Sequence, residues 1–237
     1  MFTIQLSGHT INPVSDFINT AVIPWKTKNL KYTGLTLGIT AGLFLADENI
    51  TEYMRKHQSS SFSEFIKYPK LWGDGHYIIA GGSVLLLSGL IIKEPKITSL
   101  GIYIYEGFLY SGLYVTFVKF IFGRARPYTE EGSLSFHPFS TETANTSFYS
   151  GHTTEAFTLS SIIANYFKNT YISILAYTVS ALTGIERVYN NKHWTSDVFL
   201  GAVTGIIIGK SIIDNNTDIH YDWKNSSIRI SIYSRGL

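Results

Sequence analysis

Six apolar blocks separated by polar stretches constrain this chain more than any other feature. The blocks are Tyr32–Ala46, Tyr77–Ile92, Ile97–Val118, Thr153–Phe167, Asn169–Ile185 and Val198–Ile213. Only Glu106, Glu155 and Lys210 carry charge inside them. Because Gly, Ser, Thr and aromatic residues are scattered through each block, the pattern favours helices that approach one another closely. We therefore predict an all-α fold, a six-helix bundle.

Block length leaves the relation of this bundle to a membrane open. A helix that spans a bilayer needs about 20 residues, with a range of roughly 17–25. Ile97–Val118 has 22 residues and Asn169–Ile185 has 17, whereas the other four blocks have 15 or 16. We favour a transmembrane bundle, and a soluble or peripheral bundle is the alternative.

Shifts in composition divide the chain into three parts. An N-terminal segment of residues 1–31 precedes the helical domain of residues 32–213, and a polar tail occupies residues 214–237. In the tail, the isoleucines within residues 228–232 alternate with polar residues, a pattern that predicts a short strand.

Charge and cysteine content exclude several classes of function. The chain has 19 Lys and Arg against 17 Asp and Glu, a net charge of +2. Without a basic excess, we do not expect a nucleic-acid partner. The sequence contains no cysteine, which excludes disulfides, thiolate nucleophiles and Cys-ligated zinc. The sequence does not indicate an oligomeric state.

The polar loops predict which side of a membrane carries the chemistry. If all six blocks span, the loops Asp47–His76, Lys119–His152 and Glu186–Asp197 share one face. Once the three cations assigned to the site below are set aside, that side has six Lys and Arg, against ten on the side of the termini. The positive-inside rule then places the termini in the cytoplasm. We expect a multi-pass protein of an inner or plasma membrane with its site on the non-cytoplasmic side; a periplasmic or peripheral location is the alternative.

Three short motifs fall at the ends of the last four blocks. In order, they are Lys119-x6-Arg126-Pro127, Ser150-Gly151-His152 and Arg187-x5-His193-x3-Asp197. Each alone has an ordinary explanation as a helix-end lysine, a helix cap or a pair one helical turn apart. Their shared position at one end of the predicted bundle favours a common site.

The motifs supply a site for an anion. Lys119, Arg126 and Arg187 are cations, and the planar arginine side chain matches the oxygens of phosphate. Ser150 and Gly151 stand where a helix is expected to begin, so the free N–H groups of the first turn attract negative charge.

The same motifs supply acid–base and nucleophilic groups. Of His152 and His193, one can attack while the other delivers a proton. Asp197 can accept a hydrogen bond from the ring of His193 and fix its tautomer. This chemistry requires no metal, and we predict no cofactor.

The order and spacing of the motifs resemble the type 2 phosphatidic acid phosphatase family, which is related to bacterial class A acid phosphatases and vanadium haloperoxidases. The resemblance covers roughly Ile97–Ile213. It implies that His193 attacks phosphorus, that Asp197 orients His193, and that His152 protonates the leaving group and then activates water. The phosphoryl oxygens would be held by Lys119, Arg126, Ser150, Gly151 and Arg187.

Two residues depart from the pattern of that family. Tyr149 stands where proline is usual, which removes a rigid backbone angle before the helix. Glu186 stands where serine is usual, so it could orient Arg187 or compete with phosphate for it. Neither departure removes a group with a proposed chemical role.

The resemblance implies a metal-independent phosphoric monoester hydrolase that acts on a phosphate monoester or diphosphate through a phosphohistidine. We expect a phosphorylated lipid as substrate, with phosphatidic acid, phosphatidylglycerol phosphate, undecaprenyl diphosphate and lipid A phosphates all admissible. The alternatives are a soluble or peripheral acid phosphatase acting on small phosphate esters, a vanadate-dependent haloperoxidase, and a membrane protein without activity.

Four further residues are weaker candidates. Asp74 and His76 lie in a Gly-Asp-Gly-His turn on the same side as the motifs, and His137 precedes the second motif. Glu106 is an ionisable residue inside the longest block, which marks a functional position if that block lies in a membrane.

Overall fold

The computed structural model describes residues 26–214 continuously. It also describes residues 4–6, 9–11, 17, 18, 20, 22, 217–222 and 227–232. Every predicted block is helical, which confirms the all-α prediction. The six corresponding helices are α2 (Leu30–Lys56), α4 (Gly75–Ile92), α5 (Pro95–Phe122), α6 (Gly151–Phe167), α7 (Thr170–Tyr189) and α8 (Thr195–Asp214).

The first long loop of the prediction is largely helical. Helix α2 continues through Asp47 to Lys56, and α3 (Ser60–Ile66) follows. The charged residues Glu52, Arg55 and Lys56 are compatible with helix and lie at its exposed end. Four short 3₁₀ helices also occur among the described residues: η2 (Thr27–Asn29), η3 (Pro69–Gly73), η4 (Pro127–Thr129) and η5 (Thr143–Asn145).

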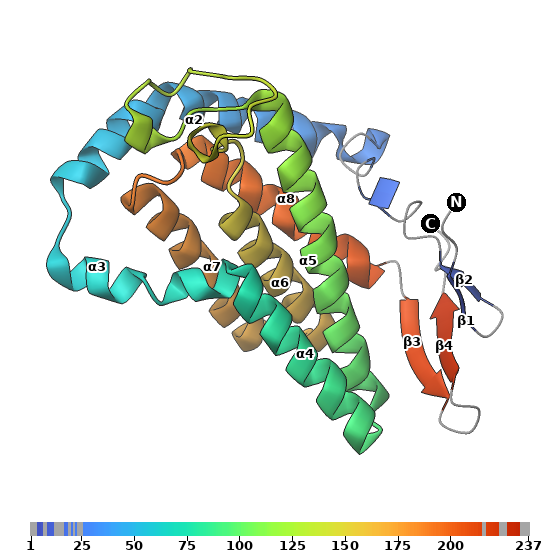
Figure 1. Ribbon diagram of the computed structural model, residues 1–237. Coiled ribbons are helices and arrows are strands. Elements are labelled where there is room, and N and C mark those ends of the chain that lie inside the picture. Colours follow the sequence, from blue (N-terminus) through green and yellow to red (C-terminus); the bar gives the residue numbers. More distant parts are fainter. Residues whose placement is uncertain are drawn as a thin grey trace.

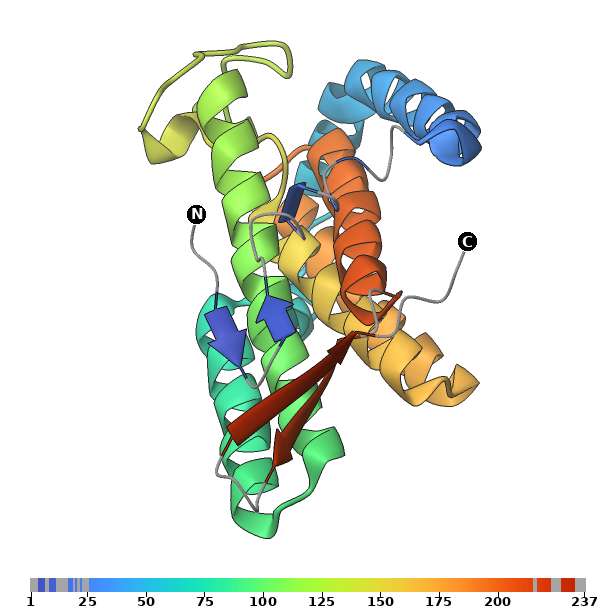
Figure 2. The ribbon, with the colours of Figure 1, turned by 90° about the vertical axis from the view of Figure 1, so that its right-hand side faces the viewer.

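Helix α6 is the centre of the bundle. It packs against α8, α7 and α5, and α4 and α5 form an antiparallel pair (Figure 1). Helix α2 differs from the other long helices because it lies across the end of the bundle (Figures 1 and 2). The loop that follows α5 lies at this same end, with the first residues of α6 and α8.

Short polar side chains cap the first turns of α6 and α4. The hydroxyl of Ser150 caps α6, and the carboxylate of Asp74 accepts a hydrogen bond from the His76 N–H at the start of α4. Gly123 ends α5 with a φ of +58°, and a Cβ there would lie 1.7 Å from the His137 carbonyl oxygen. Only glycine therefore permits this turn, which directs the first motif back over the bundle.

Small residues bring α8 against α6. A Cβ at Gly205 would lie 2.4 Å from the carbonyl oxygen of Thr154, and one at Gly209 would lie 2.5 Å from that of Thr158. The two helices are thus in backbone contact, as in tightly packed membrane bundles. Around this contact lies an apolar core that includes Ile162 of α6.

The outer surface of the bundle is rich in large apolar side chains. Leu45, Ile91 and Tyr171 are each more than three-quarters exposed. Among the described residues, α4 and α8 are long and apolar enough to cross a membrane, with mean hydropathies of 1.8 and 1.6.

Two antiparallel hairpins accompany the helices. Strands β3 (Thr217–Asp222) and β4 (Ser227–Ile232) pair in the tail, so the strand predicted there is confirmed. Strands β1 (Ile4–Leu6) and β2 (His9–Ile11) form the second hairpin, which the sequence did not predict. Both hairpins lie beside the bundle near α5 (Figure 2). The division into three parts at residues 31 and 213 stays a prediction.

The glycine contact of α8 predicts that the same glycine-to-alanine change affects stability differently in α8 and in α2. Gly205→Ala should lower the free energy of unfolding by about 1–3 kcal/mol, because the added methyl group overlaps the backbone of α6. Gly38→Ala in α2 meets nothing within 4 Å, and should leave stability unchanged or raise it by up to ~1 kcal/mol. Thermal unfolding of both variants in detergent measures the difference. Equal stabilities would contradict the packing described for α6 and α8.

Candidate active site

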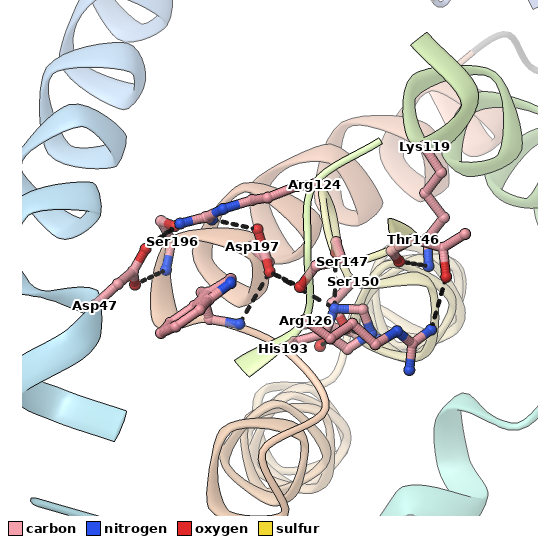
Figure 3. Close-up of polar contacts among 12 residues, drawn as sticks. Asp47, Lys119, Arg124, Arg126, Thr146, Ser147, Ser150, His193, Ser196 and Asp197 are labelled. Carbon is pink, nitrogen blue, oxygen red and sulfur yellow. Dashed lines mark hydrogen bonds and ion pairs between the residues drawn. The ribbon is translucent and has the colours of Figure 1, made fainter. Parts of the chain in front are cut away.

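The three sequence motifs meet at one end of the bundle. Lys119 lies at the end of α5, His152 in the first turn of α6, and Arg187 in the last turn of α7. His193 lies in the loop between α7 and α8, and Asp197 lies in the first turn of α8. The close-up in Figure 3 shows side chains from the first and third motifs around the start of α6.

The ring of His193 is buried and held in one tautomer. Its Nδ1 lies 2.7 Å from the carbonyl oxygen of Ser147. Because a carbonyl can only accept, Nδ1 carries the proton and Nε2 has a free lone pair. Burial lowers the pKa of His193 to about 3, so the ring is neutral at neutral pH. A neutral ring with an unprotonated Nε2 is the form that can attack phosphorus.

Asp197 is near His193 but does not accept its proton directly. The distance from Nδ1 of His193 to Oδ2 of Asp197 is 3.7 Å, beyond hydrogen-bond range. The same Oδ2 instead accepts from the Ser147 hydroxyl at 2.5 Å and from the Trp194 N–H at 2.9 Å. Ser147 therefore connects the two residues: its hydroxyl donates to Asp197, and its carbonyl accepts the ring proton of His193.

Two cations of the first motif converge on Thr146. Nζ of Lys119 donates to the Thr146 carbonyl at 2.7 Å, and Nη2 of Arg126 donates to its hydroxyl at 3.0 Å (Figure 3). Nε of Arg126 is buried and has no hydrogen-bond partner among the residues that the structure describes. A buried guanidinium donor without a partner is costly, so this donor is suited to an oxygen of a bound anion.

The third cation, Arg187, forms an ion pair with Glu186, which is one of the two residues that depart from the family pattern. Both Nε and Nη2 of Arg187 contact Oε2 of Glu186, and the other carboxylate oxygen accepts from Asn190 at 2.7 Å. Glu186 is 2% exposed. It therefore fixes the orientation of Arg187 and occupies one edge of the guanidinium.

The second motif is built as a buried helix start. Ser150 is fully buried, and its hydroxyl accepts from the hydroxyl of Thr153 at 2.9 Å, while its N–H donates to the Asp197 carbonyl at 3.2 Å. Gly151 begins α6, so its N–H belongs to the unpaired first turn. Tyr149, the other departure from the family pattern, is 5% exposed and packs in an apolar cluster with Val115.

Two charged residues for which the sequence predicted no catalytic or binding role are buried behind the site. Arg124 and Asp47 are both 0% exposed and lie 2.8 Å apart between Nη2 and Oδ2. Nη1 of Arg124 also lies 2.6 Å from Oδ1 of Asp197. Arg124 lies within the first motif, and Asp47 directly follows an apolar block. The charge of Asp47 at the edge of an apolar block was the available signal in the sequence. That position alone does not identify Arg124, 77 residues away, as its partner.

The weaker candidates take different positions. His76 has an almost fully exposed side chain paired with Asp74, and His137 pairs with Glu131 at 2.7 Å on the surface. Gly73, in the same turn as Asp74, packs against α6, where a Cβ would lie 2.1 Å from the His152 carbonyl oxygen. The turn therefore lies against the site.

Comparison with known sequences decides the family. The sequence profile of the PAP2 superfamily matches residues 99–218, just over half of the chain and all three motifs. The chain belongs to the PAP2 superfamily. The suspected resemblance to the type 2 phosphatidic acid phosphatases is thereby confirmed.

Curated relatives of this PAP2 superfamily member include lipid A phosphatases. Over 94 residues it is 38% identical to a lipid A 1-phosphatase of Porphyromonas gingivalis, covering 39% of this chain and 18% of that protein. Over 147 residues it is 32% identical to a lipid A 1-phosphatase of Rhizobium etli, covering 56% and 62%. The chain thus spans less than two thirds of the length of these relatives.

Two solved structures share the fold. The crystal structure of Aquifex aeolicus LpxE aligns with a TM-score of 0.54 at 22% identity, over 70% of this chain and 94% of that one. The crystal structure of a transmembrane PAP2-type phosphatidylglycerolphosphate phosphatase from Bacillus subtilis aligns with a TM-score of 0.53 at 18% identity, over 85% and 94%.

The geometry around Arg126 predicts how the site binds an anion. Arg126→Lys should weaken binding of inorganic phosphate about tenfold or more, because lysine cannot replace the buried Nε donor, and a hydrogen bond to a charged group contributes about 1.5–3 kcal/mol. Arg55→Lys is the matched control, since Arg55 makes an exposed ion pair with Glu130. Competition by phosphate in a hydrolysis assay measures both affinities. Equal affinities in the two variants would remove Arg126 from the anion site.

Proposed function

We propose that this protein is a metal-independent phosphatase that removes a phosphoryl group from a lipid through a phosphohistidine. One observation carries the proposal: the buried ring of His193 is neutral, its Nδ1 proton is fixed by the Ser147 carbonyl, and the charges of Lys119 and Arg126 act on it. This combination supports the role of His193 as a nucleophile beside cations that would hold the phosphoryl oxygens.

The reaction follows from these groups in two steps. Nε2 of His193 attacks phosphorus, the bond from phosphorus to the ester oxygen breaks, and the leaving alkoxide takes a proton from His152. His152 then removes a proton from water, whose oxygen attacks phosphorus and returns the electron pair of the P–N bond to Nε2. Lys119, Arg126 and Arg187 offset the charge on the phosphoryl oxygens in both steps.

The side chains of the site support a reaction without a metal. Positive charge comes from lysine and arginine, which can stabilise a transferring phosphoryl group as a metal does. Within residues 26–214, no group of three or more His, Asp or Glu side chains is arranged to hold a metal ion.

A lipid substrate is supported by the surface of the protein and by its relatives. Helices α4 and α8 have the length and composition of membrane spans, and large apolar side chains cover the outside of the bundle. The curated relatives are named for phosphatases of lipid A. We therefore propose that α4 to α8 lie in a membrane and that the substrate is a phosphorylated glycolipid of the lipid A class. A panel of lipid phosphates with purified protein tests this choice, and hydrolysis of only water-soluble esters would contradict it.

The two histidines should fail at different steps. His193→Ala should abolish turnover of every substrate, because no phosphoenzyme can form. His152→Ala should lower the turnover rate of a lipid phosphate about 10²–10⁴-fold. It should lower the turnover rate of p-nitrophenyl phosphate less, because that leaving group needs little protonation. Rapid acid quench with labelled substrate, in excess EDTA, measures turnover and phosphoenzyme together.

The turnover rate of Asp197→Asn should lie between those of the two histidine variants, because the nucleophile remains but is held less well.

Phosphoenzyme label trapped by the His193→Ala variant would place the nucleophile elsewhere. Activity that returns only when Mg²⁺ is added would contradict metal independence.

We also propose that the site opens on the non-cytoplasmic side, which is the side that the Lys and Arg count predicts when all six blocks are taken as spans. That bias counts α2 as a span, whereas α2 lies across the end of the bundle (Figure 1), so the side is best measured directly. Thr141→Cys and Thr170→Cys are matched probes, because both positions are exposed and lie at opposite ends of the bundle. In intact cells an impermeant maleimide should label Cys at position 141 but not at position 170. The reverse pattern would overturn the orientation.

A further inference from the structure

A buried arginine joins two carboxylates behind the nucleophile. Arg124 donates to Asp47 of α2 at 2.8 Å and to Asp197 of α8 at 2.6 Å. It also donates to the Ser133 carbonyl and the Ser196 hydroxyl, each at 2.8 Å. The arginine and both carboxylates are 0% exposed. Figure 3 shows the guanidinium of Arg124 between the carboxylates of Asp47 and Asp197. No solvent shares in this network, so its charges must be balanced by protein groups.

Asp47 is also bound firmly to the start of α8. Its Oδ1 accepts from the Ser196 N–H at 2.9 Å, and its Oδ2 accepts from the Ser196 hydroxyl. Negative charge at the beginning of a helix is favoured by the helix dipole. Helix α2 therefore fixes the turn that carries Asp197.

The network has one more negative charge than positive. Two carboxylates face one guanidinium, which leaves a net charge of −1 with no access to water. The adjacent ring is that of His193, with Nδ1 3.7 Å from Asp197. This ring is neutral before reaction and gains positive charge as Nε2 bonds to phosphorus. The excess negative charge is therefore complementary to the reacting state rather than to the resting one.

We propose that Asp47 and Arg124 are positioning residues for the nucleophile, acting through Asp197 and Ser147 on His193. They supply the fixed charge against which the ring becomes positive, and they hold the Ser147 carbonyl that orients it. This inference rests on the proposed function. It adds a contribution from α2, which lies outside the segment that matches the PAP2 superfamily.

Asp47→Asn tests the charge while it preserves the shape of the side chain. In purified full-length protein, kcat should fall about tenfold to a hundredfold, less than the ~10²–10³ for a donor that touches the reacting group. KM should stay unchanged, because the cations that hold phosphate are not part of the network. Binding of orthovanadate, which mimics the reacting state, should weaken with kcat, while binding of inorganic phosphate should not.

Glu48→Gln is the matched control. Glu48 is the next residue of α2, and it accepts from the N–H and hydroxyl of Ser133 at 2.9 and 3.1 Å without contacting Asp197. The same change from carboxylate to amide should leave kcat and the ratio of vanadate to phosphate affinity as in the wild type. If Asp47→Asn weakens the binding of vanadate and of phosphate alike, Asp47 is structural only. The same conclusion follows if Asp47→Asn and Glu48→Gln lower kcat equally.

A double variant tests the route through Asp197. If Asp47 acts only through that carboxylate, Asp47→Asn should cause no further loss in the Asp197→Asn background. If the fold-losses in kcat of the two single variants multiply in the double variant, the proposed route through Asp197 is wrong. Should Asp47→Asn not fold, Ser147→Ala deletes a single hydroxyl of the same relay and should give the same split between kcat and KM.

Failure of this inference differs from failure of the proposed function. A wild-type protein that forms no phosphoenzyme with any phosphate ester would contradict the function itself. An active wild-type protein with an unchanged Asp47→Asn variant would contradict only the positioning role.

Discussion

A guanidinium without access to solvent determines how the catalytic end of this bundle is built. The four hydrogen bonds of Arg124 reach α2, the loop after α5, and the first turn of α8. An unpaired charge in this position would cost several kcal/mol, so the three stretches are stable only when they are together. Loops that lack regular secondary structure thereby take fixed positions around His193.

Charge is arranged on two sides of His193. On one side Lys119 and Arg126 lie with donors directed at Thr146, and on the other side Asp197 belongs to a buried network with excess negative charge (Figure 3). A phosphoryl group would meet the positive side, while the ring itself would become positive against the negative side. Such fixed charges need no rearrangement during the reaction, which is the main source of electrostatic catalysis.

The sequence predicted the helices and the motif residues because both depend on local pattern. Apolar blocks of 15 to 22 residues and fixed motif spacings are visible in one dimension. The buried contacts of Asp47 and Ser147 were not visible, since they reach partners 149 and 50 residues along the chain. The crosswise course of α2 was missed for the same reason: its block resembles the others, and only its buried partners distinguish it. The direct bond expected between Asp197 and His193 is replaced by a contact through Ser147, a difference of orientation that spacing cannot encode.

The glycine-lined contact between α6 and α8 has a consequence for how this protein tolerates change. Ser150 precedes α6 and Asp197 begins α8, and a Cβ at Gly201 would lie 2.9 Å from the Ser150 carbonyl oxygen. The distance between the second and third motifs is therefore set by helix backbones rather than by the side chains of the motifs. A genetic screen for inactive protein should therefore recover substitutions along this glycine face, well inside the bundle and away from the motif side chains.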